Sequence, residues 1–169
     1  MNTSPHSHTP ALHLQLGLTL IELMVTLAVV AVTLSIGVPS FQGMASSNRM
    51  SSAANSLIGA LNVARSEAIK RGARVNVAAT STTTNWTSGW KVQLNSDSTA
   101  IGTIKAFDPL TGMQITGTSA QYQFLPTGFL ALSAAETITV CDSSLTGETG
   151  RKITISISGR FSVTNTPCS

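Results

Sequence analysis

Residues 17–39 read GLTLIELMVTLAVVAVTLSIGVP and contain one charged side chain, Glu22, near the start of an apolar run. As a helix, the 21 residues from Leu18 to Val38 span roughly 31 Å, about the hydrocarbon thickness of a bilayer. A carboxylate inside such a span costs about 2.5 to 3.5 kcal/mol on insertion scales, so we expect Glu22 to have a partner. The stretch therefore predicts one membrane-spanning helix that carries a functional acid.

The start of this run, Gly17-Leu18-Thr19-Leu20-Ile21-Glu22-Leu23, resembles the processing site of class III signal sequences in type IV prepilins and pseudopilins. The resemblance implies that prepilin peptidase cuts between Gly17 and Leu18 and methylates the new amine. Two features depart from the family: Leu18 replaces the usual phenylalanine, and residues 1–17 contain no Lys or Arg. An ordinary secretory signal peptide is the alternative, but the apolar run is too long and no Ala-x-Ala-like site follows it.

The helix is expected to continue beyond Pro39, where the missing N–H and the ring should kink or loosen it. A stripe of apolar residues at three- and four-residue spacing then predicts an amphipathic helix that ends near Arg71, before Gly72. We expect the stripe to pack on a core rather than to bind a ligand. Its members are Met50, Ala53, Ala54, Leu57, Ile58, Leu61, Ala64 and Ala68.

Beyond Gly72 the apolar period changes to two, which predicts an antiparallel sheet built from short strands. The expected strands are residues 74–80, 89–95, 102–107, 121–125, 137–141, 152–158 and 160–163. Ser158-Gly159 predicts a tight two-residue hairpin, and residues 142–150 read as a mobile loop. The chain is thus expected to be α+β, with a cleaved leader (1–17), a transmembrane half-helix (18–39), an amphipathic half-helix (40–72) and a β-domain (73–169).

Short motifs beyond the N-terminal run resemble the GspH/FimT family of type IV minor pilins and pseudopilins. They are Ala64-Arg65-Ser66-Glu67-Ala68, Trp86-Thr87-Ser88-Gly89-Trp90, Cys141-Asp142 and Gly159-Arg160. The resemblance implies a long N-terminal helix packed on an antiparallel β-domain of two small sheets. It also implies insertion in the inner membrane, assembly with other pilin or pseudopilin subunits, and pairing of Glu22 with the N-terminal amine of a neighbouring subunit.

Cys141 and Cys168 are the only cysteines, and both lie in the part expected outside the cytoplasm, where disulfides persist. We predict that they are bonded. Closing a loop of about 28 residues is worth roughly 3 to 4 kcal/mol in the loop-closure model. A metal or redox site is the alternative, but the sequence has no CxxC and no histidine beyond the expected leader.

The distribution of reactive side chains argues against an enzyme and predicts no cofactor. His6, His8 and His13 all belong to the expected leader, so the mature chain cannot form a Ser-His or Cys-His pair. Trp86 and Trp90 are expected in the core rather than on an exposed stacking platform. The remaining carboxylates are expected at turns, caps or the surface: Glu67, Asp97, Asp108, Glu136, Asp142 and Glu148.

DNA binding is the main alternative function. A formal net charge of +3 is weak evidence for it. Some FimT-type minor pilins contact the backbone of double-stranded DNA through a Gly-Arg-x-Arg motif, and the matching stretch here is Gly159-Arg160-Phe161-Ser162. One arginine aligns, so Arg160, Arg151 and Lys152 are the possible contacts. The sequence favours a pilus subunit and leaves type II secretion and DNA uptake open.

Overall fold

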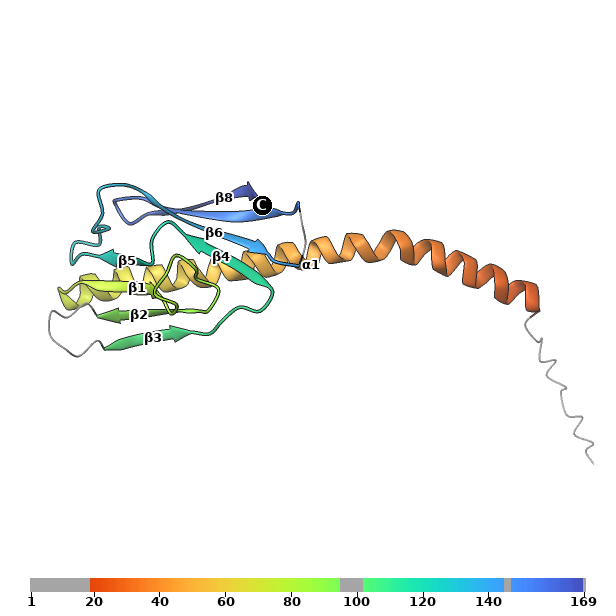
Figure 1. The fold of residues 1–169 in the computed structure, drawn as a ribbon, viewed down its shortest axis with the longest axis horizontal. Helices are drawn as coiled ribbons and strands as arrows, with labels where there is room; N and C mark the ends of the chain where they lie inside the picture. Colours follow the sequence, from red (N-terminus) through yellow and green to blue (C-terminus); the bar gives the residue numbers. More distant parts are fainter. Residues whose placement is uncertain (1–18, 95–101, 145–146, 169) are drawn as a thin grey trace, which may run out of the picture. The chain divides into compact units, whose positions relative to one another are not determined.

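The structure is a computed structural model that describes residues 19–94, 102–144 and 147–168. The chain divides into an N-terminal part that ends at Ser40 and a compact unit that covers Phe41–Ser169. Helix α1 (Leu20–Arg71) begins in the first part and ends in the second, and eight strands follow it in the described sequence (Figure 1). The expected cut between Gly17 and Leu18 lies outside the described residues.

The amphipathic part of α1 forms as predicted. All but one of the predicted stripe residues are buried, with exposed fractions of 4% or less, and Ile58 packs against the same core. The helix ends at Arg71, and Gly72 follows with φ = 62°. This left-handed conformation closes the helix without a steric penalty because glycine has no Cβ.

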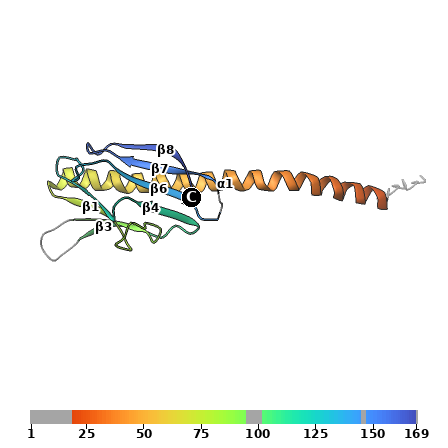
Figure 2. The same cartoon turned by 45° about the horizontal axis from the view of Figure 1, so that its top comes forward.

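The strands form two four-stranded antiparallel sheets (Figures 1 and 2). The first sheet has the order β3-β2-β1-β5, and the second has the order β4-β6-β7-β8. The strands of the first sheet are β1 (Val75–Ala79), β2 (Trp90–Leu94), β3 (Thr103–Phe107) and β5 (Gln121–Phe124). Those of the second are β4 (Met113–Gly117), β6 (Glu136–Asp142), β7 (Thr149–Ile155) and β8 (Phe161–Pro167).

One apolar core joins both sheets to the amphipathic part of α1. Side chains alternate between the two faces of each strand, which places apolar residues on the inner face of the sheet. Ile153 and Ile155 of β7 are fully buried, whereas Thr154 between them is not. Trp86 and Trp90 also lie in this core, with exposed fractions of 0% and 1%. The α+β fold, a long helix packed on two small antiparallel sheets, is therefore the one that the sequence predicted.

The strand predictions were incomplete at β4 and wrong at the bounds of β7 and β8. Strand β8 covers residues 161–167 instead of 160–163. Residues 113–117 were not predicted as a strand, although Met113, Ile115 and Gly117 are buried in strict alternation. This strand is short, follows one glycine and ends on another, so its apolar signal is weak. Strand β7 covers residues 149–155 instead of 152–158, because Ile157 lies in the following turn with 45% of its surface exposed.

The hairpin between β7 and β8 is longer than the predicted two-residue turn. Ile155 pairs with Phe161, and the N–H of Ser156 donates to the carbonyl of Arg160 at 2.9 Å. The N–H of Gly159 donates back to Ser156, and Gly159 adopts φ = 72°. Gly159 therefore supplies a left-handed position in a three-residue turn, a second common hairpin geometry.

The predicted loop over residues 142–150 is also shorter than expected. Strand β6 continues to Asp142, and β7 starts at Thr149. Only residues 143–148 connect the two strands, and residues 145 and 146 are outside the described sequence.

Candidate functional site

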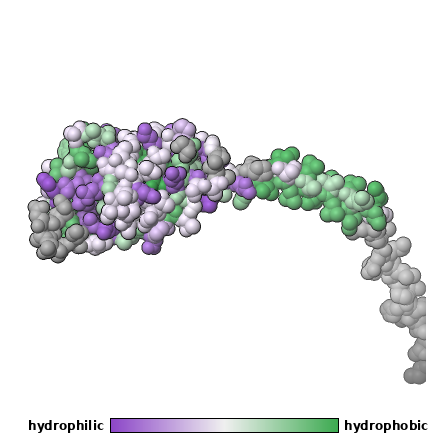
Figure 3. All heavy atoms as spheres, viewed as in Figure 1, coloured by the Kyte–Doolittle hydropathy of each residue, from purple (hydrophilic) through white to green (hydrophobic). Residues whose placement is uncertain are grey.

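The first functional feature is the N-terminal part of α1, which presents apolar side chains on all sides. Leu20 is 79% exposed and Ile36 is 71% exposed, and Figure 3 shows a continuous run of hydrophobic residues here. Within the described residues, α1 is the one helix whose length and composition suit a membrane crossing. Because folding leaves this apolar surface exposed, its burial must come from lipid or from other helices.

Glu22 lies in the first turn of this helix. The hydroxyl of Thr19 accepts the N–H of Glu22 at 3.3 Å, and the carbonyl of Thr19 accepts the N–H of Leu23 at 3.2 Å. Thr19 therefore caps the helix and fixes the position of Glu22 one turn from its start. The Glu22 side chain is exposed and forms no ion pair with another described residue, so its carboxylate is available to a partner molecule.

Hydroxyl groups within the apolar run are already hydrogen-bonded to the helix itself. Thr26 donates to the carbonyl of Leu23 at 2.9 Å, and Ser35 donates to that of Val32 at 2.7 Å. Thr33 donates in the same way to carbonyls one turn earlier. Such bonds remove the need for water around these groups in a bilayer.

Pro39 lies within the bounds of α1. The helix continues through it, and the kink or loosening expected there stays a prediction.

The disulfide joins Cys141 at the end of β6 to Cys168 after β8, with a Cα–Cα distance of 5.9 Å. Both sulfur atoms lie against Gly150 of β7. A Cβ at Gly150 would lie 2.5 Å from Cys168 Sγ and 2.8 Å from Cys141 Sγ. The pairing of these cysteines was predicted, whereas the need for a glycine beside them was not.

Asp142 is not a surface residue, although its carboxylate caps the turn that follows β6, which is one of the roles expected from the sequence. Its side chain is fully buried, and Arg49 of α1 donates to its Oδ2 at 2.8 Å. Ser144 donates to Oδ1 through both its N–H, at 2.9 Å, and its hydroxyl, at 2.5 Å. Burial raises the pKa of Asp142, but the hydrogen bonds from Ser144 and the charge of Arg49 outweigh it, so the pKa lies below its usual value. The carboxylate thus ties the β6 end to the helix.

The three possible DNA contacts do not form one patch. Arg151 is held by hydrogen bonds to Asn165 Oδ1 at 2.7 Å and to Ser47 Oγ at 3.1 Å. Lys152 is the next residue of β7 and therefore points to the opposite face of the sheet. Arg160 is exposed in the turn, about 17 Å along β8 from the pairing partner of Arg151.

Another arginine reaches the same turn from the helix. Arg65 Nη1 donates to the carbonyl of Gly159 at 3.0 Å, so the Arg65 motif on α1 and the Gly159 turn are in direct contact. Neither motif alone predicted this contact. It gives Arg65 a structural role in holding the hairpin against the helix.

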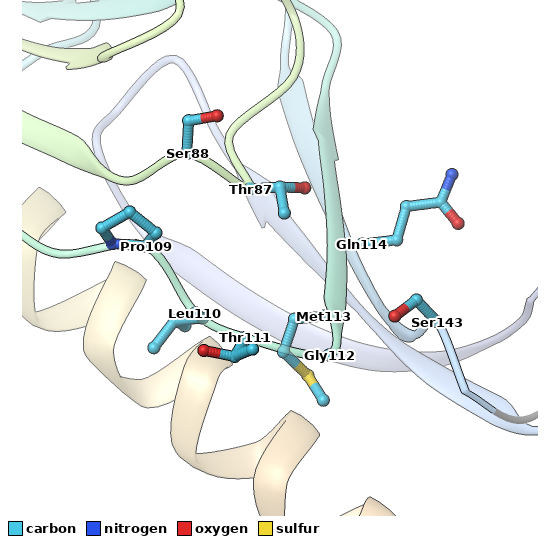
Figure 4. Close-up of a pocket in the computed structure, with 9 residues that line it drawn as sticks. All are labelled: Thr87, Ser88, Pro109, Leu110, Thr111, Gly112, Met113, Gln114 and Ser143. Carbon is cyan, nitrogen blue, oxygen red and sulfur yellow. The ribbon is translucent and has the colours of Figure 1, made fainter.

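The aromatic residues and the surface pocket beside β4 offer no catalytic set. Trp86 stacks on Tyr122 with a centroid distance of 5.1 Å and donates from Nε1 to the carbonyl of Ser119 at 3.0 Å, as expected for a core residue. An open pocket of about 560 Å³ lies beside β4, and Figure 4 shows the residues that line it. None of its nine lining residues is ionisable, and the hydroxyl of Thr87 accepts the N–H of Ile115. The pocket therefore lacks the acid, base or ligand groups of an active site.

Comparison with known proteins gives the family. Residues 53–159, more than half of the chain, match the family described as Type II transport protein GspH. No curated protein sequence matches the chain.

Solved structures of minor pilins and pseudopilins are similar to this chain. One crystal form of the type IV minor pilin FimU from Pseudomonas aeruginosa is 26% identical, with a TM-score of 0.57 over 68% of this chain and 91% of that one. A second form gives 24% identity and a TM-score of 0.60, covering 69% and 89%. The minor pseudopilin EpsH of the Type 2 Secretion System of Vibrio cholerae is 13% identical, with a TM-score of 0.55 over 69% and 97%. The chain therefore belongs to the GspH family, the structural and non-enzymatic minor pilins and pseudopilins of type IV pili and type II secretion systems.

Proposed function

We propose that this chain is a minor pilin that is incorporated into a type IV pilus and supports its biogenesis. The observation that carries the proposal is the exposed apolar part of α1 with Glu22 in its first turn. The proposed path starts with cleavage between Gly17 and Leu18 by prepilin peptidase. The processed chain then crosses the inner membrane once, with its β-sheets in the periplasm, until it enters the filament.

The pilus is favoured over the secretion pseudopilus by the similarity to FimU. At 26% identity this likeness reaches beyond the fold, whereas the 13% identity to EpsH supports the fold alone. Both systems use helices that bundle in an apolar filament centre, so assembly itself does not separate them. The role of a minor pseudopilin in type II secretion is the second candidate.

Glu22 is the residue proposed to select correct assembly. In the apolar centre of a filament, an unpaired carboxylate and an unpaired N-terminal ammonium are both costly. Pairing them offsets the two costs and fixes the axial register between neighbouring helices. The capped position of Glu22 supports this role because the first turn of α1 holds the carboxylate at the N-terminal end of the apolar run, where a neighbouring subunit can reach it.

The test is the substitution Glu22→Ala in the full-length chain, compared with Thr33→Ala as a control in the same apolar run. We expect Glu22→Ala to be cleaved and inserted normally but to fall at least about tenfold in sheared filaments. Thr33→Ala removes only a hydroxyl that bonds its own helix, so it should enter filaments normally. Mass spectrometry of both products should give chains that begin at Leu18. Normal incorporation of Glu22→Ala would contradict the pairing.

DNA binding receives less support than assembly. The exposed guanidinium of Arg160 fits a phosphate contact, but Arg151 is engaged by Asn165 and Ser47, and Lys152 lies on another face. Backbone binding draws its affinity from several phosphates neutralised together. The separation of these cations therefore argues against DNA as the main partner.

A further inference from the structure

Each sheet has two edge strands, and three of the four edges are covered or protected. Strand β5 is covered by the segment after it: the N–H of Ala131 donates to the carbonyl of Gln123 at 2.8 Å. Strand β4 is covered by residues 84–87: the N–H of Trp86 donates to the carbonyl of Ile115 at 2.8 Å. Strand β3 carries Lys105 and pairs with β2 through an irregular register. Charge and irregularity are common ways to block an edge.

Strand β8 lacks all of these protections. It is seven residues long, pairs with β7 in unbroken register, and contains no charged side chain. Its central residues are exposed, including Val163 at 44%. Among residues 19–94, 102–144 and 147–168, no segment pairs with its outer side, and β8 forms the outer border of its sheet in Figures 1 and 2.

The pairing register of β7 and β8 identifies which backbone groups of β8 have no hydrogen-bond partner in the sheet. Ser156 and Arg160 pair by a hydrogen bond at one end, and Cys168 donates to Glu148 at 3.1 Å at the other. Because bonding alternates in an antiparallel pair, residues 162, 164 and 166 bond to β7. Phe161, Val163 and Asn165 therefore direct both N–H and C=O outward. The backbone of Pro167 also faces outward, so its missing N–H removes no hydrogen bond to β7. Without that donor, Pro167 ends the edge that a further strand could pair with.

We propose that the outer edge of β8, residues 161–165, binds an extended strand from a neighbouring subunit of the filament by β-augmentation. The free N–H and C=O groups along β8 can pair with the backbone of an extended chain. Because β8 carries no charged side chain, its edge suits a partner strand that is also uncharged and rich in β-branched residues. The inference rests on the proposed function, since the partner is another filament subunit. It assigns this chain a lateral contact besides the helix bundle.

Hydrogen exchange on the full-length chain tests the edge without any substitution. The probe is the wild-type chain, first dispersed alone in detergent and then in filaments assembled with the other subunits of its system. We expect the amides of Phe161, Val163 and Asn165 to exchange at least about tenfold more slowly in filaments. Unchanged exchange in filaments would overturn the proposal. Equal protection in the chain alone would show pairing between copies and would also overturn it.

Two substitutions at Val163 distinguish the contribution of the backbone N–H to incorporation from that of the side chain. Val163→Pro removes an outward N–H but no bond to β7, whereas Val163→Thr keeps the N–H in a side chain of similar shape. We expect Val163→Pro to reduce incorporation about tenfold and Val163→Thr to stay near wild type. Equal incorporation of the two would overturn the proposal. Trp86 and Trp90 fluorescence checks that both are folded; if Val163→Pro is not, the exchange result decides.

Incorporation of the wild-type chain distinguishes a failure of the proposed function from a failure of the edge contact alone. A wild-type chain that enters filaments with an unprotected β8 retains the proposed function and loses only the edge contact. A wild-type chain that never enters filaments overturns the proposed function. It also overturns the edge contact, because the proposed partner of β8 is another filament subunit.

Discussion

Asp142 shows how one buried carboxylate can make the stability of the β-domain depend on pH. Its folded-state pKa is lowered, so the folded chain binds fewer protons than the unfolded chain as the pH falls below the ordinary value of 3.8. The stabilisation is therefore present above about pH 4 and is lost as the pH falls through the folded-state pKa. We expect Asp142→Ala to lower stability by about 1 to 3 kcal/mol at pH 7.

The measurement is unfolding followed by the fluorescence of Trp86 and Trp90 between pH 7 and pH 3. Asp142→Ala should lose less stability on acidification than wild type, because the titrating group is gone. Asp108→Asn is the matched control, since Asp108 is exposed. An equal acid-induced loss in wild type and Asp142→Ala would show that Asp142 does not carry the effect.

Gly150 gives a second prediction at the same scale. A Cβ there meets both disulfide sulfurs and lies 2.6 Å from the carbonyl of Val140. Gly150→Ala should therefore destabilise the chain by about 1 to 3 kcal/mol, the usual cost of overpacking. Gly59→Ala is the control because no atom lies within 4 Å of its added Cβ, and in a helix it should stabilise by about 0.5 to 1 kcal/mol. Chemical unfolding measures both, and a neutral Gly150→Ala would show that the disulfide can move aside.

At the scale of elements, the amphipathic part of α1 carries the core. Leu61 is fully buried in the cluster that joins the helix to both sheets, whereas its neighbour Asn62 is exposed. Leu61→Ala should cost about 2 to 5 kcal/mol through lost burial and the cavity left behind. Asn62→Ala should stay within about 0.5 kcal/mol of wild type. Chemical unfolding checks the pair, and similar stabilities would mean that α1 is not part of the folding core.

This stripe was readable from the sequence because a helix imposes its period over many residues. Met50 and Ala68 are five turns apart, so the 3.6-residue repeat is unambiguous. Strand β4 offers only Met113 and Ile115 as large apolar residues, too few to establish a period of two. Its identity depends on pairing with β6, in which Ile115 faces Val140, and a single sequence does not contain that pairing.

At the scale of the whole molecule, contacts between distant segments were the least predictable part of the site. The cysteine pairing was predictable because the sequence offers only two cysteines. Arg49 and Asp142 are 93 positions apart, and each resembles an ordinary surface residue until the fold brings them together. Arg65 and Gly159 are 94 positions apart, and the resemblance of each to a family motif gave no sign of their contact.

The distribution of cations over the whole molecule leads to the last prediction, on DNA. Lys152 pairs with Thr164, so Arg160 lies about 13 Å further along β8, and Arg151 is turned toward Ser47. Few phosphates can be neutralised together, so we expect no complex with double-stranded DNA to survive at about 150 mM salt in a mobility-shift assay of the full-length chain. The contrary result would be a complex that persists there, is lost in Arg160→Ala and is retained in Lys105→Ala, which removes an exposed charge on the other sheet. It would instead show that the hairpin binds DNA.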